Sequence, residues 1–456
     1  MKRVILLVCF ACVTGLWFTA CNDSKNTTTT TTTTKKAPQD NDVYIPSAYS
    51  FYVDSVKVIF KNVQTEAISV QLFFRGGAAN YTKNQEGIEP ITLQTVSQGG
   101  TVKFPYENFN SYLETYGIKM NDSSYYDFGA ISMKCISKFW NKSWDLFSEV
   151  VNNPSFDEDY FNRVKNEQLL VLKGIKNSPE GFIRNVALSK AFENKNYFKQ
   201  PWGTVESIEK LTIDDCKNYY SALLKQNKMV LVVIGNISED DLKQKVRETL
   251  TQYETGRTIP RDTAQFRVPA STVIYEQKPI ATNYIYGMVN VPPVNTREYF
   301  AMKLAMQMFS NKIDLELRSK RNLAYFPKAD VVDLRVPYAY ISYSTNDPNE
   351  AANIVIKELK NIKLYGFDQV EFRNQKSLFF TNFYMKQLNY QDLGYLLGST
   401  EMQSSWQFTE QLIPLINSIT LREVNEAMNK YIKGIRWNYL GYKDKLDEKI
   451  YLQPLN

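Results

Sequence analysis

The stretch from Gly87 to Thr101 has the sequence GIEPITLQTVSQGGT. Its apolar residues recur at the spacing of a helix face, and the paired glycines near its end are typical of a helix stop. The stretch therefore predicts one short helix. The whole chain of 456 residues contains no histidine. Because imidazole is the commonest metal ligand and general base in proteins, this composition excludes every site that needs one.

The composition indicates a globular protein large enough for two or three cores. Of its residues 43% are hydrophobic and 22% are charged, which is an ordinary balance. The formal net charge is +6 and is spread along the chain. We find no dense block of Lys and Arg and no aromatic-basic motif, so nucleic-acid binding is not expected.

Residues 1–20 are predicted to be a signal peptide. Lys2 and Arg3 precede an apolar run from Val4 to Trp17, which is too short to span a bilayer comfortably. The segment ends in Phe-Thr-Ala followed by Cys21, which resembles a bacterial lipobox. We therefore expect lipidation of Cys21 and a lipid-anchored protein of the bacterial cell envelope, either periplasmic or on the outer membrane. An ordinary secretory signal with a chance cysteine is the alternative.

Residues 21–42 are predicted to form a solvated tether. Eight consecutive threonines, Thr27 to Thr34, bury nothing and are flanked by polar sequence. Outside the signal and the lipidation position, only Cys135 and Cys216 remain. They have no spaced partners of the kind found in zinc knuckles, and the sequence leaves open whether they pair with each other.

The folded body is predicted to contain two domains, residues 43–254 and 267–456. A polar linker with Gly256 and Pro260, residues 255–266, separates them. Strands are expected where β-branched and aromatic residues gather, and helices where apolar residues recur every three to four positions. The expected strands are 56–60, 68–74, 120–139 as a pair, 229–234, 272–275, 283–291, 323–334 and 339–344. The expected helices are 87–98, 108–116, 140–193 with breaks near 153 and 178, 213–225, one starting after Ser238, 297–309, 312–320 and 349–383.

A faint internal repeat supports the two-domain division. Phe-Asp at 156–157 recurs at 367–368, an offset of 211 residues. Leu-Thr-Ile at 211–213 is matched by Ile-Thr-Leu at 419–421, and Ile-Gly-Asn at 234–236 by Leu-Gly-Tyr at 440–442, offsets of 208 and 206. Three weak pairs at nearly one offset predict a duplicated α+β domain.

The order of these features resembles the inverted zinc peptidases, the group of pitrilysin, insulysin and the mitochondrial processing peptidase. The resemblance covers most of the chain after the tether and implies two homologous domains, each an antiparallel-rich sheet covered by helices, that form half of a clamshell. The residues that carry it are Phe73–Gly77, Gly87–Ile88, Gly99–Thr101, Asn153–Phe156, Pro201–Ile208 with Leu211-Thr212, Val232–Asn236, Leu317-Arg318 and Asn322–Tyr325.

The residues that hold zinc in this family are missing. The family motif His-x-x-Glu-His falls on Pro90, Leu93 and Gln94 in place of its two histidines and its glutamate. The family's third ligand is a glutamate seven residues after another acidic residue, and here Glu167 is followed at that distance by Gly174. A catalytic zinc needs three protein ligands, so the chain is expected to bind no metal and not to be an enzyme by itself.

Two residues that contact the substrate in active relatives are retained, namely Arg318 and Tyr325. An Arg fork can hold a peptide carbonyl, and a phenol can donate a hydrogen bond to a developing oxyanion. The resemblance therefore implies a substrate-binding role for the pair. The alternative is that Arg318 is a solvated helix residue and that Tyr325 starts a packed strand.

Together these features predict the non-catalytic subunit of a heterodimeric zinc peptidase. In some members of the family one chain carries the zinc and a homologous chain carries the Arg/Tyr pair. Zinc is then expected only in the partner, and the complex would degrade peptides in the cell envelope. The alternative is a stand-alone peptide-binding or scaffold lipoprotein without hydrolytic activity. Enzymatic activity of another kind is not expected, because the sequence contains neither Gly-x-Ser-x-Gly nor a phosphate-binding glycine loop.

Overall fold

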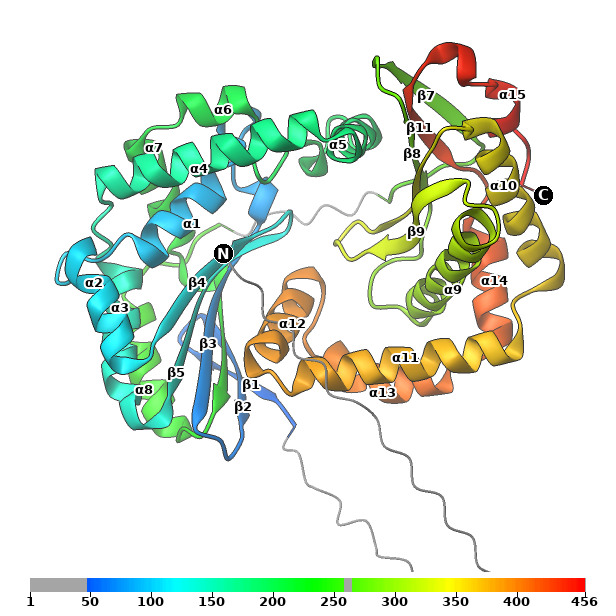
Figure 1. Cartoon of the computed structure of the whole chain (residues 1–456). Helices are drawn as coiled ribbons and strands as arrows, with labels where there is room; N and C mark the ends of the chain where they lie inside the picture. The colour runs from blue at the N-terminus through cyan, green and yellow to red at the C-terminus, as the bar shows by residue number, and fades with distance from the viewer. Residues whose placement is uncertain (1–46, 258–264, 456) are drawn as a thin grey trace, which may run out of the picture. The chain divides into compact units, whose positions relative to one another are not determined.

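The structure is a computed structural model that describes residues 47–257 and 265–455. These described residues form one compact unit. It contains two mostly antiparallel sheets with helices on both faces of each sheet, which confirms the predicted α+β class (Figure 1). The signal peptide, the tether and the middle of the predicted linker lie outside the described residues, so the domain boundaries remain predictions.

The first sheet has six strands in the order β1-β2-β6-β3-β5-β4. Only β2 and β6 run parallel to each other, and the other neighbours are antiparallel. The strands are β1 (Tyr49–Val53), β2 (Val56–Asn62), β3 (Ala67–Arg75), β4 (Lys119–Ser124), β5 (Phe128–Ile136) and β6 (Met229–Gly235). The accompanying helices are α1 (Ile88–Gln98), α2 (Tyr106–Tyr116), α3 (Trp140–Asn152), α4 (Glu158–Asn177), α5 (Pro179–Ala191), α6 (Val205–Lys210), α7 (Ile213–Leu223) and α8 (Glu239–Leu250).

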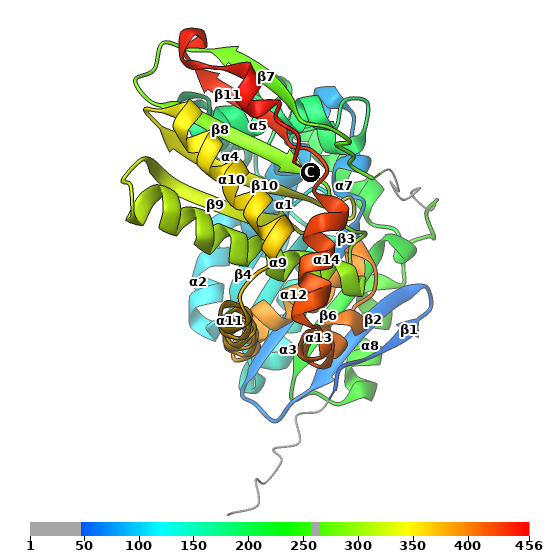
Figure 2. The same ribbon diagram turned by 90° about the vertical axis from the view of Figure 1, so that its right-hand side faces the viewer.

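The second sheet has five strands in the order β7-β11-β8-β10-β9, again with one parallel pair, β7 and β11. The strands are β7 (Thr272–Gln277), β8 (Asn283–Val289), β9 (Ala324–Val332), β10 (Tyr338–Thr345) and β11 (Arg436–Gly441). The helices are α9 (Arg297–Ile313), α10 (Pro348–Tyr365), α11 (Gln369–Gln387), α12 (Tyr390–Gln403), α13 (Gln407–Ser418), α14 (Leu421–Tyr431) and α15 (Glu448–Tyr451). Figure 2 shows α9, α10 and α14 lying over one face of this sheet.

Capping residues explain the repeat that the sequence contains. The side chain of Asp157 caps α4, and that of Asp368 caps α11 in the second half. Thr212 and Thr420 each start a helix with a capping box. An N-cap side chain accepts a hydrogen bond from an amide that would otherwise have no partner, so these short polar residues fix where equivalent helices begin.

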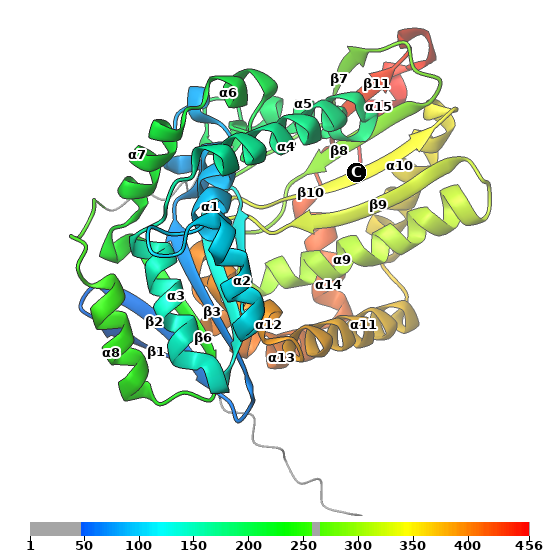
Figure 3. The same cartoon turned by 60° about the vertical axis from the view of Figure 1, so that its left-hand side comes forward.

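Strand β6 is buried along its whole length, as its apolar sequence predicts. Leu231 and Val233 pack into the core on the side of α1, α3, α7 and α8, which Figure 3 shows in front of the strands. Val230, Val232 and Ile234 pack on the opposite side, together with residues of α12. A central strand with helices on both faces has no solvated side, which accounts for a run without polar alternation.

The two halves exchange helices. α12, from the second half of the chain, packs against β3 and β6 of the first sheet, and α5, from the first half, packs against β8 and β11 of the second (Figure 1). Gly394 and Gly398 let α12 approach closely, because a Cβ there would lie 2.5 Å from Gln71 Nε2 and 2.1 Å from the Phe73 ring. The Gln71 amide also donates to the Gln391 carbonyl at 2.6 Å.

Two details of the predicted elements are corrected. The helices expected at 297–309 and 312–320 form one continuous run, because α9 extends to Ile313 and passes directly into a π-helical segment, η6 (Asp314–Ser319). Strand β1 was not predicted from its sequence YSFYV, which is short and precedes a tight turn at Asp54.

Candidate functional site

Helix α1 is held at its start by the segment that follows α5. Gly87 adopts a left-handed conformation with φ of 84°, and a Cβ on it would lie 2.9 Å from the Gly203 Cα. The Ser207 hydroxyl donates to the Glu86 carbonyl at 2.8 Å. The Pro-Trp-Gly-Thr-Val-Glu-Ser-Ile segment therefore shapes the entry of α1, which explains why these two stretches occur together.

The positions of the missing zinc motif are occupied by residues that cannot replace its chemistry. Pro90 and Leu93 are buried and have no side-chain donor atom, and Gln94 is half-buried. On α4, Glu167 is exposed and lies 3.9 Å from Arg163, while Gly174 has open space where a side chain would be. No group of three His, Cys, Asp or Glu within residues 47–257 and 265–455 is arranged to hold a metal ion.

A buried carboxyl group on α1 was not anticipated from the sequence. Glu89 is completely inaccessible to solvent and accepts hydrogen bonds from the Ser124 hydroxyl at 2.7 Å and the Tyr219 hydroxyl at 2.6 Å. Burial raises the pKa of Glu89 to about 7, and the two hydrogen bonds oppose the shift. Gly129 on β5 makes the space, since a Cβ there would lie 2.8 Å from the Glu89 carboxyl carbon.

The second end of α1 is tied to β4 in the same way. Asp122 accepts hydrogen bonds from Ser97 at 3.2 Å and from Gln98 at 3.1 Å. Burial raises its pKa to about 6. α1 stands at the place of the helix that carries zinc in the family that the chain resembles. Here hydrogen bonds to two carboxyl groups hold this helix against the sheet. These contacts have a structural role. Glu89 on α1 bonds to β4 and α7, and Asp122 on β4 bonds to the end of α1.

The two predicted substrate-binding residues lie on different elements, and their role stays a prediction. Arg318 lies in the π-helical segment η6, where its side chain is 59% exposed and lies 3.8 Å from Asp314. Tyr325 is on β9, is 55% exposed and lines a cavity. No hydrogen bond joins the two side chains in the described part of the chain, and Arg318 is not among the residues that line the cavity. The remaining predicted site residue, Cys21, lies outside the described residues, and Cys135 and Cys216 are buried free thiols.

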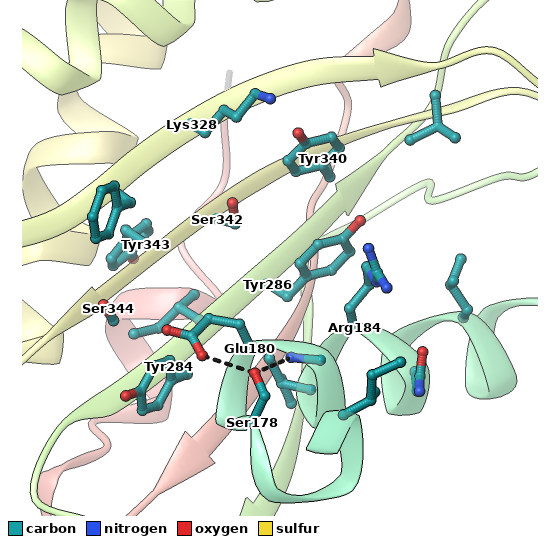
Figure 4. A pocket seen from close by; sticks show the side chains of 18 of the residues that line it. Ser178, Glu180, Arg184, Tyr284, Tyr286, Lys328, Tyr340, Ser342, Tyr343 and Ser344 are labelled. Atoms are coloured by element: carbon teal, nitrogen blue, oxygen red, sulfur yellow. Dashed lines mark hydrogen bonds between the residues drawn. The ribbon is translucent and has the colours of Figure 1, made fainter. Parts of the chain in front are cut away.

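The cavity has a volume of about 730 Å³ and lies between α5 and the face of the second sheet that α9, α10 and α14 do not cover (Figure 4). Such a volume is typical of small-ligand sites. Trp202 and Phe326 also line it. Tyrosines dominate its wall, namely Tyr125, Tyr126, Tyr284, Tyr286, Tyr325, Tyr338, Tyr340 and Tyr343.

Strand alternation places most of these hydroxyl groups on one face. On β10, Tyr340, Ser342 and Ser344 are two residues apart and therefore point the same way. The register pairs Tyr286 with Ser342 and Tyr284 with Ser344 on the neighbouring strand β8. The rings of Tyr286 and Tyr340 are parallel, with centroids 5.4 Å apart. The face is thus aromatic and rich in hydroxyl groups.

Three charged side chains enter the cavity from opposite walls. Arg184 and Glu180 come from α5, and Lys328 comes from β9. Figure 4 shows the Arg184 guanidinium beside the Tyr286 hydroxyl, whereas the Glu180 carboxylate turns toward Tyr284. No ion pair involving Arg184 or Lys328 occurs within the described residues. The cavity therefore has an excess of one positive charge.

The fold and these positions define a protein of the two-domain peptidase type that has other residues at the positions of the zinc motif and an aromatic cavity beside its second sheet. A family model described as "Insulinase (Peptidase family M16)" matches residues 57–204, and one described as "Peptidase M16 inactive domain" matches residues 210–379. The chain belongs to the M16 peptidase family, as a member that lacks the family's zinc-binding motif.

Two relatives from Helicobacter pylori are similar to the chain. A protein named "Non-peptidase homolog YmxG" is 26% identical over 190 residues, which are 41% of this chain and 43% of that protein. A "Zinc protease PqqE" is 22% identical over 341 residues, 70% of this chain and 76% of that protein. The match thus spans less than half of the first relative's length.

The fold itself is shared with solved structures. A structure titled as the peptidase M16 inactive domain from Pseudomonas fluorescens superposes with a TM-score of 0.77 at 17% identity, over 87% of this chain and 98% of that chain. At this identity the likeness establishes the fold alone. It confirms the processing-peptidase-like duplicated domain that the sequence predicted.

Proposed function

We propose that this chain is the non-catalytic subunit of a heterodimeric zinc peptidase. It supplies substrate-binding surface, including Arg318 and Tyr325, to a zinc-bearing homologous partner that degrades peptides in the cell envelope. The observation that carries this proposal is the combination of a two-sheet peptidase fold with Pro90, Leu93 and Gln94 at the positions of the zinc motif.

The relatives support the pairing. Helicobacter pylori has both a protein named as a non-peptidase homologue and a protein named as a zinc protease, and this chain is similar to both. A fold retained without its metal site is expected when a second, metal-bearing copy performs the reaction. The position of Tyr325 at the cavity supports a role in substrate binding, whereas Arg318 would act from the exposed surface next to it.

Anchoring through a lipid on Cys21 completes the proposal. The apolar run before Cys21 and the polar tether after it favour a lipoprotein held at a membrane. Among residues 47–257 and 265–455, no helix has both the length and the apolar character needed to cross a bilayer.

The test is a pull-down of the tagged full-length protein from detergent-solubilised native membranes. We expect a zinc-bearing homologue to co-purify in equal amount and the eluate to cleave peptides in a chelator-sensitive manner. A protein that elutes alone and without activity would refute the heterodimer and favour the second candidate, a stand-alone peptide-binding lipoprotein, for which the cavity is the supporting observation.

The Arg318→Ala variant tests the role of that residue in the complex. We expect a lower peptidase activity with unchanged co-purification, because the Arg318 side chain is mostly exposed. Arg373→Ala is the matched control, since Arg373 is an exposed arginine on α11 away from the cavity. Equal activity in both variants would show that Arg318 does not contact substrate.

A further inference from the structure

We propose that the tyrosine-lined cavity binds a peptide segment in which an aromatic side chain stands next to a carboxylate. The carboxylate comes either from the end of a peptide chain or from an acidic side chain. This inference rests on the proposed function only in taking peptides as the ligand class, and it does not require the partner subunit.

The wall of the cavity fits an aromatic ring. Tyr286 and Tyr340 present parallel rings, and Tyr284 lies on the same face of the sheet. Aromatic pairs attract each other beyond the effect of buried area when their rings stack with an offset or meet edge to face. The hydroxyl groups of these tyrosines and of Ser342 and Ser344 can also bind the polar groups of a peptide backbone.

The charges of the cavity fit an anion. Arg184 and Lys328 approach from α5 and β9 on opposite walls, and neither is engaged in an ion pair within the described residues. Burial raises the pKa of Tyr286 and Tyr340, and the positive charge of Arg184 opposes the rise in both, which is consistent with a guanidinium that faces the cavity. Lys328 likewise opposes the rise in the pKa of Tyr340. A carboxylate between these cations would accept charge-assisted hydrogen bonds.

The single acidic group does not cancel this preference. Glu180 accepts a hydrogen bond from the Ser178 hydroxyl at 3.2 Å and is turned toward Tyr284, away from the guanidinium (Figure 4). The charged groups are therefore sorted along the cavity, with the cations near Tyr286 and Tyr340 and the carboxylate near Tyr284. A ligand carboxylate at the cationic end does not meet Glu180 directly.

The equivalent surface of the first sheet is covered by α12. There α12 lies flush because Gly394 and Gly398 face β3, whereas the positions 211 residues earlier on α5 are Ile183 and Ala187. These larger side chains are buried against the second sheet. On the second sheet, the cavity that carries the tyrosines and cations lies beside this packed helix.

The rim of the cavity contains a strained aromatic residue. Phe326 has φ of 47° and is 80% exposed. It lies in a bulge of β9, where the pairing with β10 shifts between Ser342 and Ser344. A bulky residue in the left-handed region is unfavourable, and such strain and bulges gather at binding sites because they redirect side chains. The bulge puts an exposed ring at the mouth of the cavity.

The test is isothermal titration calorimetry with the purified full-length chain in detergent. The probes are acetyl-Ala-Tyr with a free carboxylate, its carboxyl-terminal amide, acetyl-Tyr-Asp amide and acetyl-Ala-Ala with a free carboxylate. The acetyl-Ala-Tyr amide lacks a carboxylate, and acetyl-Ala-Ala lacks an aromatic ring. We expect acetyl-Ala-Tyr, acetyl-Tyr-Asp amide or both to bind about tenfold more tightly than these two probes. Which of the two binds identifies the source of the carboxylate.

Variants locate the binding to this cavity. Arg184→Gln and Lys328→Gln are expected to weaken binding by about tenfold to a hundredfold each, since a charged hydrogen bond is lost. Both side chains are exposed, so these variants should fold, and Ser342→Trp should block the cavity by filling it. Arg373→Gln, an exposed change on α11, is the control and should leave binding unchanged.

Equal affinity for all four probes, or unchanged binding in Arg184→Gln and Lys328→Gln, would overturn the inference, as would the lack of any binding. Peptide binding by a chain that co-purifies with no partner would instead refute the heterodimer and leave the cavity assignment standing. A chain that pairs with a zinc peptidase and binds none of the probes would refute the cavity assignment alone.

Discussion

Replacement of Glu89 by glutamine is expected to make the protein more stable at neutral pH and to change how its stability depends on pH. Glu89 is fully buried and accepts hydrogen bonds from Ser124 and Tyr219. A glutamine has nearly the same shape, and because a hydroxyl group can also accept a hydrogen bond, Ser124 or Tyr219 can rotate to accept one from the new amide. The substitution therefore removes the charge and retains the packing.

The magnitude follows from the pKa of the carboxyl group. Burial raises the pKa of Glu89 from 4.5 to about 7. A raised pKa means that the folded state binds the proton more tightly than the unfolded state. The contribution of Glu89 to stability is therefore complete below the unfolded value and is lost as the pH rises through the folded value. Each unit of pKa corresponds to about 1.4 kcal/mol, so the loss across this window is about 3 kcal/mol.

Urea denaturation at a series of pH values from about 4.5 to about 7.5 measures this difference. As the pH rises across this series, the free energy of unfolding of Glu89→Gln is expected to increase by about 3 kcal/mol relative to that of the wild type. Glu86 and Asp122 also have raised pKa values, about 7 and about 6, so the variant should retain part of the pH dependence. Glu114→Gln, a change at an exposed residue of α2, is the control. Parallel curves for Glu89→Gln and the wild type would refute the reasoning.

Three further predictions concern packing, charge and anchoring. Gly398→Ala should destabilise the protein by about 1–3 kcal/mol, because the added Cβ would meet the Phe73 ring. Gly174→Ala, in open space on α4, is the control and should stabilise the protein by up to about 1 kcal/mol. Equal denaturation midpoints for the two variants would contradict the packing described here. Glu401→Gln should lower the free energy of unfolding by about 3 kcal/mol in the same assay, because the buried Glu401 carboxylate lies 2.9 Å from Lys57 of β2 and 2.8 Å from Arg75 of β3. A loss below about 0.5 kcal/mol would contradict this role of the carboxylate. Cys21→Ser should move the protein from the membrane fraction to the soluble fraction and abolish incorporation of labelled fatty acid, and continued labelling would place the lipid elsewhere.

The sequence predicted the elements whose signals are local. Helix starts at Ser238, Thr212 and Asp157 depend on short polar side chains next to apolar periodicity, and all three cap helices in the structure. The run Met229–Gly235 could be identified as a buried strand because no polar residue interrupts it. The absence of zinc-binding residues needed no structure at all, since the chain contains no histidine.

The cavity could be predicted only in part. The alternation Tyr-Ala-Tyr-Ile-Ser-Tyr-Ser at 338–344 already shows a strand with one face of hydroxyl groups. That α5, more than 140 residues earlier, lies opposite this face depends on long-range packing, which no local pattern specifies. For the same reason Arg318 and Tyr325 were paired by sequence spacing, whereas the structure brings only Tyr325 to the cavity.

The exchange of α5 and α12 between the halves has a consequence for the order in which the protein is made. Strand β6 completes the first sheet at Gly235, but α12, which covers one face of that sheet, begins only at Tyr390. While the intervening 154 residues are being synthesised, Phe73 and Val232 on that face have no cover from the chain. We therefore expect the newly made first half to need a chaperone until α12 has been synthesised. A fragment that ends in the linker is expected to aggregate.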